Sequence, residues 1–356
     1  MVRGLAGPER PAPFRAGRGL GADAVLFPDF LVIGAQKAGT TWLQRNLQTH
    51  PDIWMPPEKE LHYFDEKIEL EGGLLKRLRG EAPADKRWRR QAKSRLKQSP
   101  KDLKWQDVAW DLKYFLVRPT DAWYASLFER GEGKITGETT PDYSILDRAR
   151  ISHVHDVMPH AKIVFMMRSP LERPWSAMDM GLRVRGRSWD TLKDKRVFRR
   201  FDRGRSRLMT DYMRTLENWG SFYPEDRIFV GFLEDVSLFP EELLRRLYGF
   251  LGVDAFSEHN VIKRKIHSGF QETMPARFAS YLARSYHGDL KRLSARFGGY
   301  ASFWLYCAER LMEEDRPTDD RLSYPLYESR LWREWDGAAG ISPQSGPLYS
   351  VRAASP

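Results

Sequence analysis

The sequence predicts an α/β fold in which helices flank a central, mostly parallel sheet. Three short apolar runs, rich in β-branched and aromatic residues, each stop at a turn and are followed by a helical stretch: residues 30–33, 162–167 and 227–233. Short buried strands that alternate with helices are typical of parallel sheets covered on both faces. Ligands of such sheets bind beyond the carboxyl ends of the strands, so the residues after each run are the candidate site.

Each of the three apolar runs is bounded by a turn or by expected helices. Residues 30–33 stop at Gly34, and a helix is expected from Thr40 or Thr41 through Leu47, closed by His50-Pro51. The second run ends at Arg168, before the turn Ser169-Pro170 and a helical stretch. The third run follows a helix expected over about residues 206–219 and precedes one over about residues 241–251.

The composition is that of a folded enzyme with an anionic partner. Hydrophobic residues make up 41% of the 356 residues and aromatic residues 13%, which excludes a disordered chain. The formal net charge of +10 indicates nucleic acid, phosphorylated nucleotides, acidic glycans or a lipid surface, without choosing among them.

Cysteine usage and hydropathy indicate a cytoplasmic protein. Cys307 is the single cysteine, so the chain forms no intramolecular disulfide and no cysteine-based zinc site. The first 27 residues lack the apolar core of a signal peptide, and no run approaches the roughly 18 apolar residues of a transmembrane segment.

The domain organisation is expected to be simple. Residues 1–25 form a flexible tail rich in Gly, Pro and Arg, residues 26–310 form the main domain with a basic insert over 66–110, residues 311–336 form a packed C-terminal extension, and residues 337–356 form a second flexible tail.

Positive charge is concentrated in two tracts. Residues 76–104 hold twelve Lys or Arg against three acidic residues, and residues 183–207 hold eleven against three. Solvated helix faces explain such tracts most simply, but interleaved tryptophans are also typical of surfaces that bind nucleic acid or another anionic polymer.

The first motif is a glycine-framed loop between a strand and a helix, Gly34-Ala35-Gln36-Lys37-Ala38-Gly39-Thr40-Thr41-Trp42. Backbone amides in such a loop and at the helix N-terminus bind anions. The glycines have the spacing of a Walker A loop, but Thr40 follows the second glycine, and the lysine lies two positions before it. This arrangement favours one phosphosulfate over a triphosphate and predicts a P-loop-like three-layer fold.

The second motif follows the second strand, and the third lies about twenty residues after the loop. Arg168 and Ser176 are suited to bind one phosphate together, although an arginine at a strand end more often forms a surface ion pair. In the segment Lys59-Glu60-Leu61-His62-Tyr63-Phe64-Asp65, alternation predicts an extended segment with Glu60 and His62 on one side. Glu60 would then act as a general base for an acceptor.

In this order and spacing, the motifs resemble the superfamily of sulfotransferases that use 3′-phosphoadenosine 5′-phosphosulfate (PAPS). The resemblance is closest to the branch of heparan sulfate N- and O-sulfotransferases and their bacterial relatives. It rests on GAQKAGTTWL, ELHYFD and MRSPLERPWS, and on segments that are similar to the family's WY and GE-x-(S/T)-P-x-Y patterns, Trp123-Tyr124 and Gly137-Glu138-Thr139-Thr140-Pro141-Asp142-Tyr143.

The resemblance implies roles for individual residues. Lys37 would contact the bridging oxygen and the sulfuryl group of PAPS, while Ala38, Gly39, Thr40, Thr41 and Trp42 surround the 5′-phosphate. Arg168 and Ser176 would bind the 3′-phosphate, Glu60 would be the base, and His62 with Asp65 would position the acceptor. Family members use no catalytic metal. The acceptor would be a hydroxyl or amine of a glycan, a lipid or a small molecule.

Two departures from the family pattern and two rival functions remain. Thr139 stands where glycan-modifying relatives often have a lysine, and the segment 263–269 matches the family's nucleotide lid only weakly. The rivals are a P-loop kinase or NTPase, which the displaced lysine opposes, and a non-catalytic module that binds an anionic polymer. A nucleic-acid partner is not expected.

Overall fold

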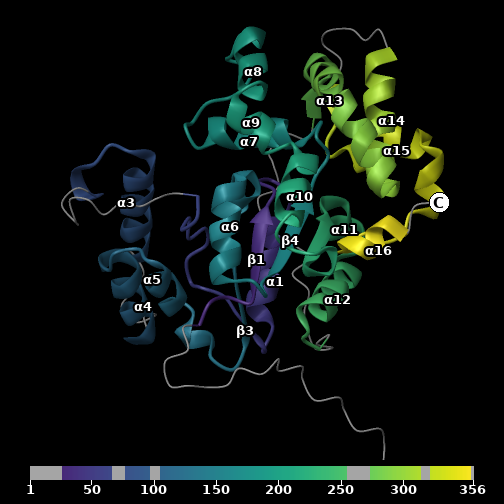
Figure 1. Cartoon of the computed structure of the whole chain (residues 1–356). Coiled ribbons are helices and arrows are strands. Elements are labelled where there is room, and N and C mark those ends of the chain that lie inside the picture. The colour runs from purple at the N-terminus through teal and green to yellow at the C-terminus, as the bar shows by residue number, and fades with distance from the viewer. Residues whose placement is uncertain (1–25, 66–76, 97–104, 255–272, 314–320, 354–356) are drawn as a thin grey trace, which may run out of the picture.

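The computed structural model describes residues 26–65, 77–96, 105–254, 273–313 and 321–353, and the expected tail over residues 1–25 lies outside them. Figure 1 shows a central sheet with helices on both of its faces. The predicted fold class is therefore confirmed. Within the described residues, no helix has the length and apolar composition needed to cross a membrane. The cytoplasmic location stays a prediction.

The central sheet has six strands in the order β2-β3-β1-β4-β5-β8. The first five are parallel and the last is antiparallel: β1 (Phe30–Gly34), β2 (Ile53–Trp54), β3 (Ile135–Thr139), β4 (Lys162–Met167), β5 (Ile228–Phe232) and β8 (Gly346–Pro347). Every residue of β1 and β5 is buried, as expected where helices cover both faces. All three strands predicted from the sequence are confirmed.

The helices around the sheet pack in pairs. The ring of His50, at the end of α1 (Thr40–Thr49), lies 4.6 Å from that of Tyr248 in α12 (Pro240–Leu251), while α6 (Arg148–Val157) packs on α10 (Tyr212–Gly220). Among the remaining helices, α11 (Leu233–Leu238) contacts β5, and α8 (Asp194–Phe201) packs on α7 (Arg173–Arg183) and α9 (Gly204–Leu208).

Further elements lie at the two sides of the sheet in Figure 1. On one side are the helices α3 (Pro83–Leu96), α4 (Trp105–Leu116) and α5 (Asp121–Ser126). On the other are α13 (Ala276–Phe297), α14 (Gly299–Glu313), α15 (Arg330–Glu334) and α16 (Leu348–Ala353), and a second small sheet pairs β6 (Thr273–Pro275) with β7 (Arg321–Ser323).

The expected helix over residues 206–219 is divided into α9 and α10. Asp211 interrupts it because its side chain accepts a hydrogen bond from the backbone N–H of Arg214, 3.1 Å away, and so caps a new helix. An N-terminal cap of this kind competes with continuation of the preceding turn.

The C-terminal segment corrects the flexible tail expected over residues 337–356. Gly346 pairs with Val230 of β5, and Leu348 is buried. The buried carboxylate of Asp235 accepts hydrogen bonds from the backbone N–H of Gln344 (2.9 Å) and from the N–H and hydroxyl of Ser345 (2.6 Å each). Tertiary hydrogen bonds therefore order a segment whose composition alone is typical of a loop.

Glu138 in β3 is a buried carboxylate that accepts three hydroxyl hydrogen bonds, from Tyr124 (2.6 Å), Tyr143 (2.9 Å) and Thr140 (2.7 Å). We expect Glu138→Ala to lower the free energy of unfolding by about 3 kcal/mol or more, because three buried hydroxyls lose their acceptor. Urea denaturation measures this loss, with the exposed Glu132→Ala as the control. Equal stability of the two variants would contradict this role.

Candidate active site

The loop after β1 is shaped by its glycines. Gly34 has φ 146°, and a Cβ there would lie 2.9 Å from Cβ of Ser144, so no other residue fits. Gly39 has φ 85° and precedes α1 without any side-chain cap. The first amides of a helix lack intrahelical partners, and the helix dipole adds positive potential there. The loop and the start of α1 thus have the backbone geometry that the predicted anion site requires, and anion binding there stays a prediction.

Lys37 lies inside this loop in the left-handed region, with φ 76°. Its Nζ lies 3.4 Å from Sδ of Met180 in α7. Burial and the neighbouring charges of Arg168 and Arg183 lower the pKa of Lys37 to about 8. Within the described ranges, no carboxylate lies at ion-pair distance from this ammonium group, so the cation is available for an anionic ligand.

Arg168 joins the end of β4 to the Lys37 loop. Its Nη1 donates to the carbonyl oxygen of Lys37 (3.1 Å) and its Nε donates to Glu172 (3.1 Å). The side chain is buried, so it is no surface ion pair. Its Nη2 donates to the hydroxyl of Tyr324, and Ser176, in the first turn of α7, interacts with the same hydroxyl. The two residues predicted to share one phosphate therefore converge on one oxygen atom.

The segment with Glu60 and His62 is not an extended strand. Both residues have positive φ, 65° and 56°, and the Glu60 N–H donates to the carbonyl oxygen of Thr139 in β3, 3.0 Å away. The turn nevertheless brings Nε2 of His62 to 3.6 Å from Oε2 of Glu60 and Nδ1 of His62 to 2.6 Å from Oδ2 of Asp65. The three predicted side chains do lie together, by a tight turn instead of strand alternation.

The charges of this group are strongly coupled. Burial raises the pKa of Glu60, but His62 and Lys59 outweigh it and hold that pKa at about 2. Burial likewise lowers the pKa of His62, but the carboxylates of Asp65 and Glu60 outweigh it and raise the pKa to about 9. At neutral pH an imidazolium ion therefore lies between two carboxylates.

Comparison with known proteins identifies the family. Residues 28–258 match the model of the sulfotransferase family, which is more than half of the chain and includes all three motifs. The chain belongs to the sulfotransferase family. The crystal structure of a sulfotransferase from Alicyclobacillus acidocaldarius superposes with a TM-score of 0.52 at 24% identity and covers 76% of this chain and 96% of that one, so it supports the fold.

One curated relative is similar over a shorter stretch. The membrane-associated sulfotransferase kil1 of Dictyostelium discoideum is 26% identical over 152 residues, which is 43% of this chain. The match spans only 22% of that relative's length. It supports membership of the sulfotransferase family.

Lys59 lies between predicted site residues, a position that the sequence did not reveal. Its Nζ donates to the hydroxyl of Thr41 in α1 (2.9 Å) and to Oε1 of Glu60 (3.0 Å). Lys59 thereby connects the glycine-framed loop with Glu60, the predicted base. The only sign of Lys59 in the sequence was its position beside Glu60. A lysine next to a glutamate is common on any protein surface, so this position did not stand out.

Two of the predicted binding residues, Trp42 and Ala38, have buried side chains. The side chain of Trp42 lies in the apolar core of the sulfotransferase domain. Ala38 is fully buried below the loop. The expected nucleotide lid over residues 263–269 lies outside the described residues.

His62, Asp65 and Asp142 each bring one potential metal ligand atom within 4.8 Å of the others. Their charges are balanced without a metal ion, because a proton on His62 neutralises Asp65 and the guanidinium of Arg205 donates to Asp142. We therefore interpret the set as part of the charge network around Glu60.

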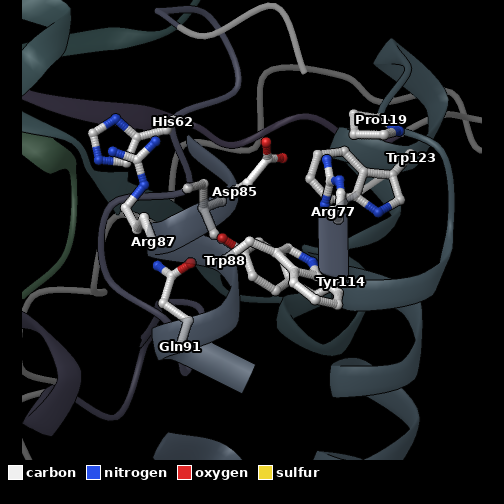
Figure 2. A pocket seen from close by; sticks show the side chains of 10 residues that line it. His62, Arg77, Asp85, Arg87, Trp88, Gln91, Tyr114, Pro119 and Trp123 are labelled. Atoms are coloured by element: carbon white, nitrogen blue, oxygen red, sulfur yellow. The ribbon is translucent and has the colours of Figure 1, made fainter. Parts of the chain in front are cut away.

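A pocket beside His62 lies on the side of the sulfotransferase fold that carries α3 and α4. Figure 2 shows aromatic and charged side chains from these helices around it, with Arg87 reaching toward His62. Its lining residues are Leu61, His62, Arg77, Asp85, Arg87, Trp88, Gln91, Tyr114, Pro119 and Trp123. The described part of the basic insert therefore forms a wall of the site.

The lowered pKa of Lys37 predicts proton uptake when an anion binds. At about pH 8.5 the ammonium group is partly deprotonated in the free protein, and a bound phosphate raises its pKa again. Calorimetry with adenosine 3′,5′-bisphosphate in buffers of different ionisation enthalpy should show this uptake at about pH 8.5 and much less at pH 6.5. Lys37→Arg stays charged and is the control; uptake that persists in it would exclude Lys37 as the source.

Proposed function

We propose that this sulfotransferase moves the sulfuryl group of PAPS to a hydroxyl or amine of its acceptor by in-line transfer. The observation that carries the proposal is the convergence of three motifs from distant parts of the chain. Arg168 contacts the carbonyl of Lys37 at 3.1 Å, and Lys59 bridges Thr41 and Glu60. Donor-binding and acceptor-activating groups thus meet at the carboxyl ends of β1 and β4.

The proposed donor site has two parts, one for the 5′-phosphosulfate and one for the 3′-phosphate. The amides of the loop and of α1, with Thr40 and Thr41, bind the 5′-phosphosulfate, while Arg168 and Ser176 bind the 3′-phosphate. Family membership implies PAPS as the donor, and the guanidinium and hydroxyl that meet at one point suit a phosphate oxygen.

The transfer itself requires charge neutralisation and one proton acceptor. The acceptor oxygen or nitrogen forms a bond to sulfur while the bond from sulfur to the bridging oxygen breaks. Lys37 stabilises the leaving phosphate and the sulfuryl oxygens. Lys59 supplies a second cation where the family lysine is replaced by the buried Thr139.

Glu60 takes the acceptor's proton in this proposal. A pKa of about 2 keeps its carboxylate ionised at every working pH. So weak a base suffices because the proton becomes strongly acidic only as the bond to sulfur forms, and transfer to Glu60 follows late in the step. His62 orients the carboxylate, and Asp65 orients His62.

The acceptor is proposed to approach from the side of His62, where side chains of α3 and α4 gather. A glycan, a lipid and a small molecule all remain candidates. The similarity to the heparan sulfate branch stays a prediction.

Two measurements test the function. Calorimetry should detect binding of adenosine 3′,5′-bisphosphate and none of comparable affinity for ATP with Mg²⁺, which a kinase or NTPase would prefer. A transfer screen with labelled PAPS across glycans, lipids and phenols should identify a sulfated product. Absence of any heat with the bisphosphate would overturn the proposal, and preferential binding of a polyanion such as heparin without transfer would favour a non-catalytic binding module.

A further inference from the structure

Tyr324 contacts both side chains that are assigned to the nucleotide's 3′-phosphate. Its hydroxyl oxygen accepts a hydrogen bond from Nη2 of Arg168 and also interacts with Ser176. The Arg168 guanidinium also lies over the tyrosine ring, 5.0 Å from its centroid. Tyr324 follows β7, beyond the residues 28–258 that match the family. The phenolic oxygen thus lies directly beside the two side chains that are proposed to bind the 3′-phosphate.

The backbone next to Tyr324 is anchored to the same turn as Arg168. One oxygen of the buried Glu172 accepts from Nε of Arg168 (3.1 Å), and its other oxygen accepts from the backbone N–H of Leu326 (2.5 Å). Leu326 is itself buried, and Leu322 of β7 pairs with Met274 of β6. The aromatic ring is therefore held beside Arg168 whether or not a ligand is bound.

We propose that Tyr324 is a third ligand of the 3′-phosphate and donates its phenolic O–H to a phosphate oxygen. This inference rests on the proposed use of PAPS. A phosphate oxygen is a stronger acceptor than a neutral phenol, so Arg168 and Ser176 transfer their hydrogen bonds to the phosphate when it binds. The hydroxyl of Tyr324, which no longer interacts with these two side chains, then donates its own hydrogen to the phosphate.

The protonation state of Tyr324 agrees with the role of a donor. Burial raises its pKa to about 12, although the charge of Arg168 acts in the opposite direction. The group therefore keeps its hydrogen at neutral pH. The C-terminal extension would in this way contribute to the choice of a 3′-phosphorylated nucleotide over one without that phosphate.

Calorimetry on the full-length protein tests the assignment with Tyr324→Phe, which removes only the hydroxyl. The matched control is Tyr327→Phe, because the hydroxyl of Tyr327 bonds to Ser237, 2.7 Å away, instead of Arg168. Two nucleotides are compared: adenosine 3′,5′-bisphosphate and AMP, the latter by displacement if its binding is weak. We expect Tyr324→Phe to weaken bisphosphate binding about 10- to 100-fold, as for a lost hydrogen bond to a charged group. AMP binding and the Tyr327→Phe protein should stay unchanged.

Comparing the two nucleotides distinguishes a Tyr324 hydroxyl that binds the 3′-phosphate from one that only supports the fold. Equal loss of both nucleotides in Tyr324→Phe would mean that the hydroxyl merely supports the fold, and unchanged or tighter binding of the bisphosphate would mean that it is no ligand; each result overturns the inference. A parental protein that fails to bind the bisphosphate would instead overturn the proposed function itself.

Discussion

Glu60→Gln is expected to lower the rate of sulfuryl transfer by about 10²- to 10⁴-fold, the usual contribution of a general base. The amide keeps the size of the side chain and can still accept from Lys59, but it cannot take the acceptor's proton. Binding of adenosine 3′,5′-bisphosphate should stay within a few-fold of the parental value, because Glu60 faces the acceptor. Single-turnover transfer from labelled PAPS measures the loss.

Glu58→Gln is the matched control for this experiment. Glu58 lies two residues before Glu60 and accepts a hydrogen bond from Gln91, 2.9 Å away, so it carries the same charge without contact to the loop. A Glu60→Gln protein that transfers sulfate at the parental rate would remove Glu60 from the role of base. A Glu58→Gln protein with the larger loss would assign that role to its neighbour.

Lys37→Ala is expected to abolish the stabilisation of the protein by adenosine 3′,5′-bisphosphate. At a ligand concentration of roughly 100 times the dissociation constant, the parental protein gains about 2.7 kcal/mol. The variant loses the cation inside the loop, and the remaining amides alone hold the 5′-phosphate weakly. Thermal unfolding with and without the nucleotide measures the difference.

Alanine at position 37 also faces a conformational cost, since the residue has φ 76°. Lys37→Asn separates the two effects, because asparagine adopts the left-handed region readily yet carries no charge. Both variants should lose ligand stabilisation alike. If Lys37→Asn keeps it, the backbone of the loop and not the ammonium group binds the nucleotide.

Local patterns predicted much of the fold and the position of the anion loop. The runs at β1, β4 and β5 are buried on both sides, so apart from Lys162 at the start of β4 their residues are apolar, and the pattern is visible without neighbours. The glycines at 34 and 39 are required by backbone geometry that is local to the turn. The turn at Glu60 was predicted as an extended segment, because a positive φ in glutamate and histidine depends on contacts with β3.

By itself, then, the sequence determined the α/β class and the glycine-framed loop, and it indicated Glu60, His62 and Asp65 as candidate residues of the site, because these depend on hydrophobic periodicity and on spacing within short segments. The tertiary structure alone decided that Lys59 joins Thr41 to Glu60, that Tyr324 contacts Arg168, and that residues 346–347 form an edge strand. The physical reason is distance along the chain: these contacts link residues far apart in sequence or side chains of ordinary composition, and only folding brings their atoms within hydrogen-bond range.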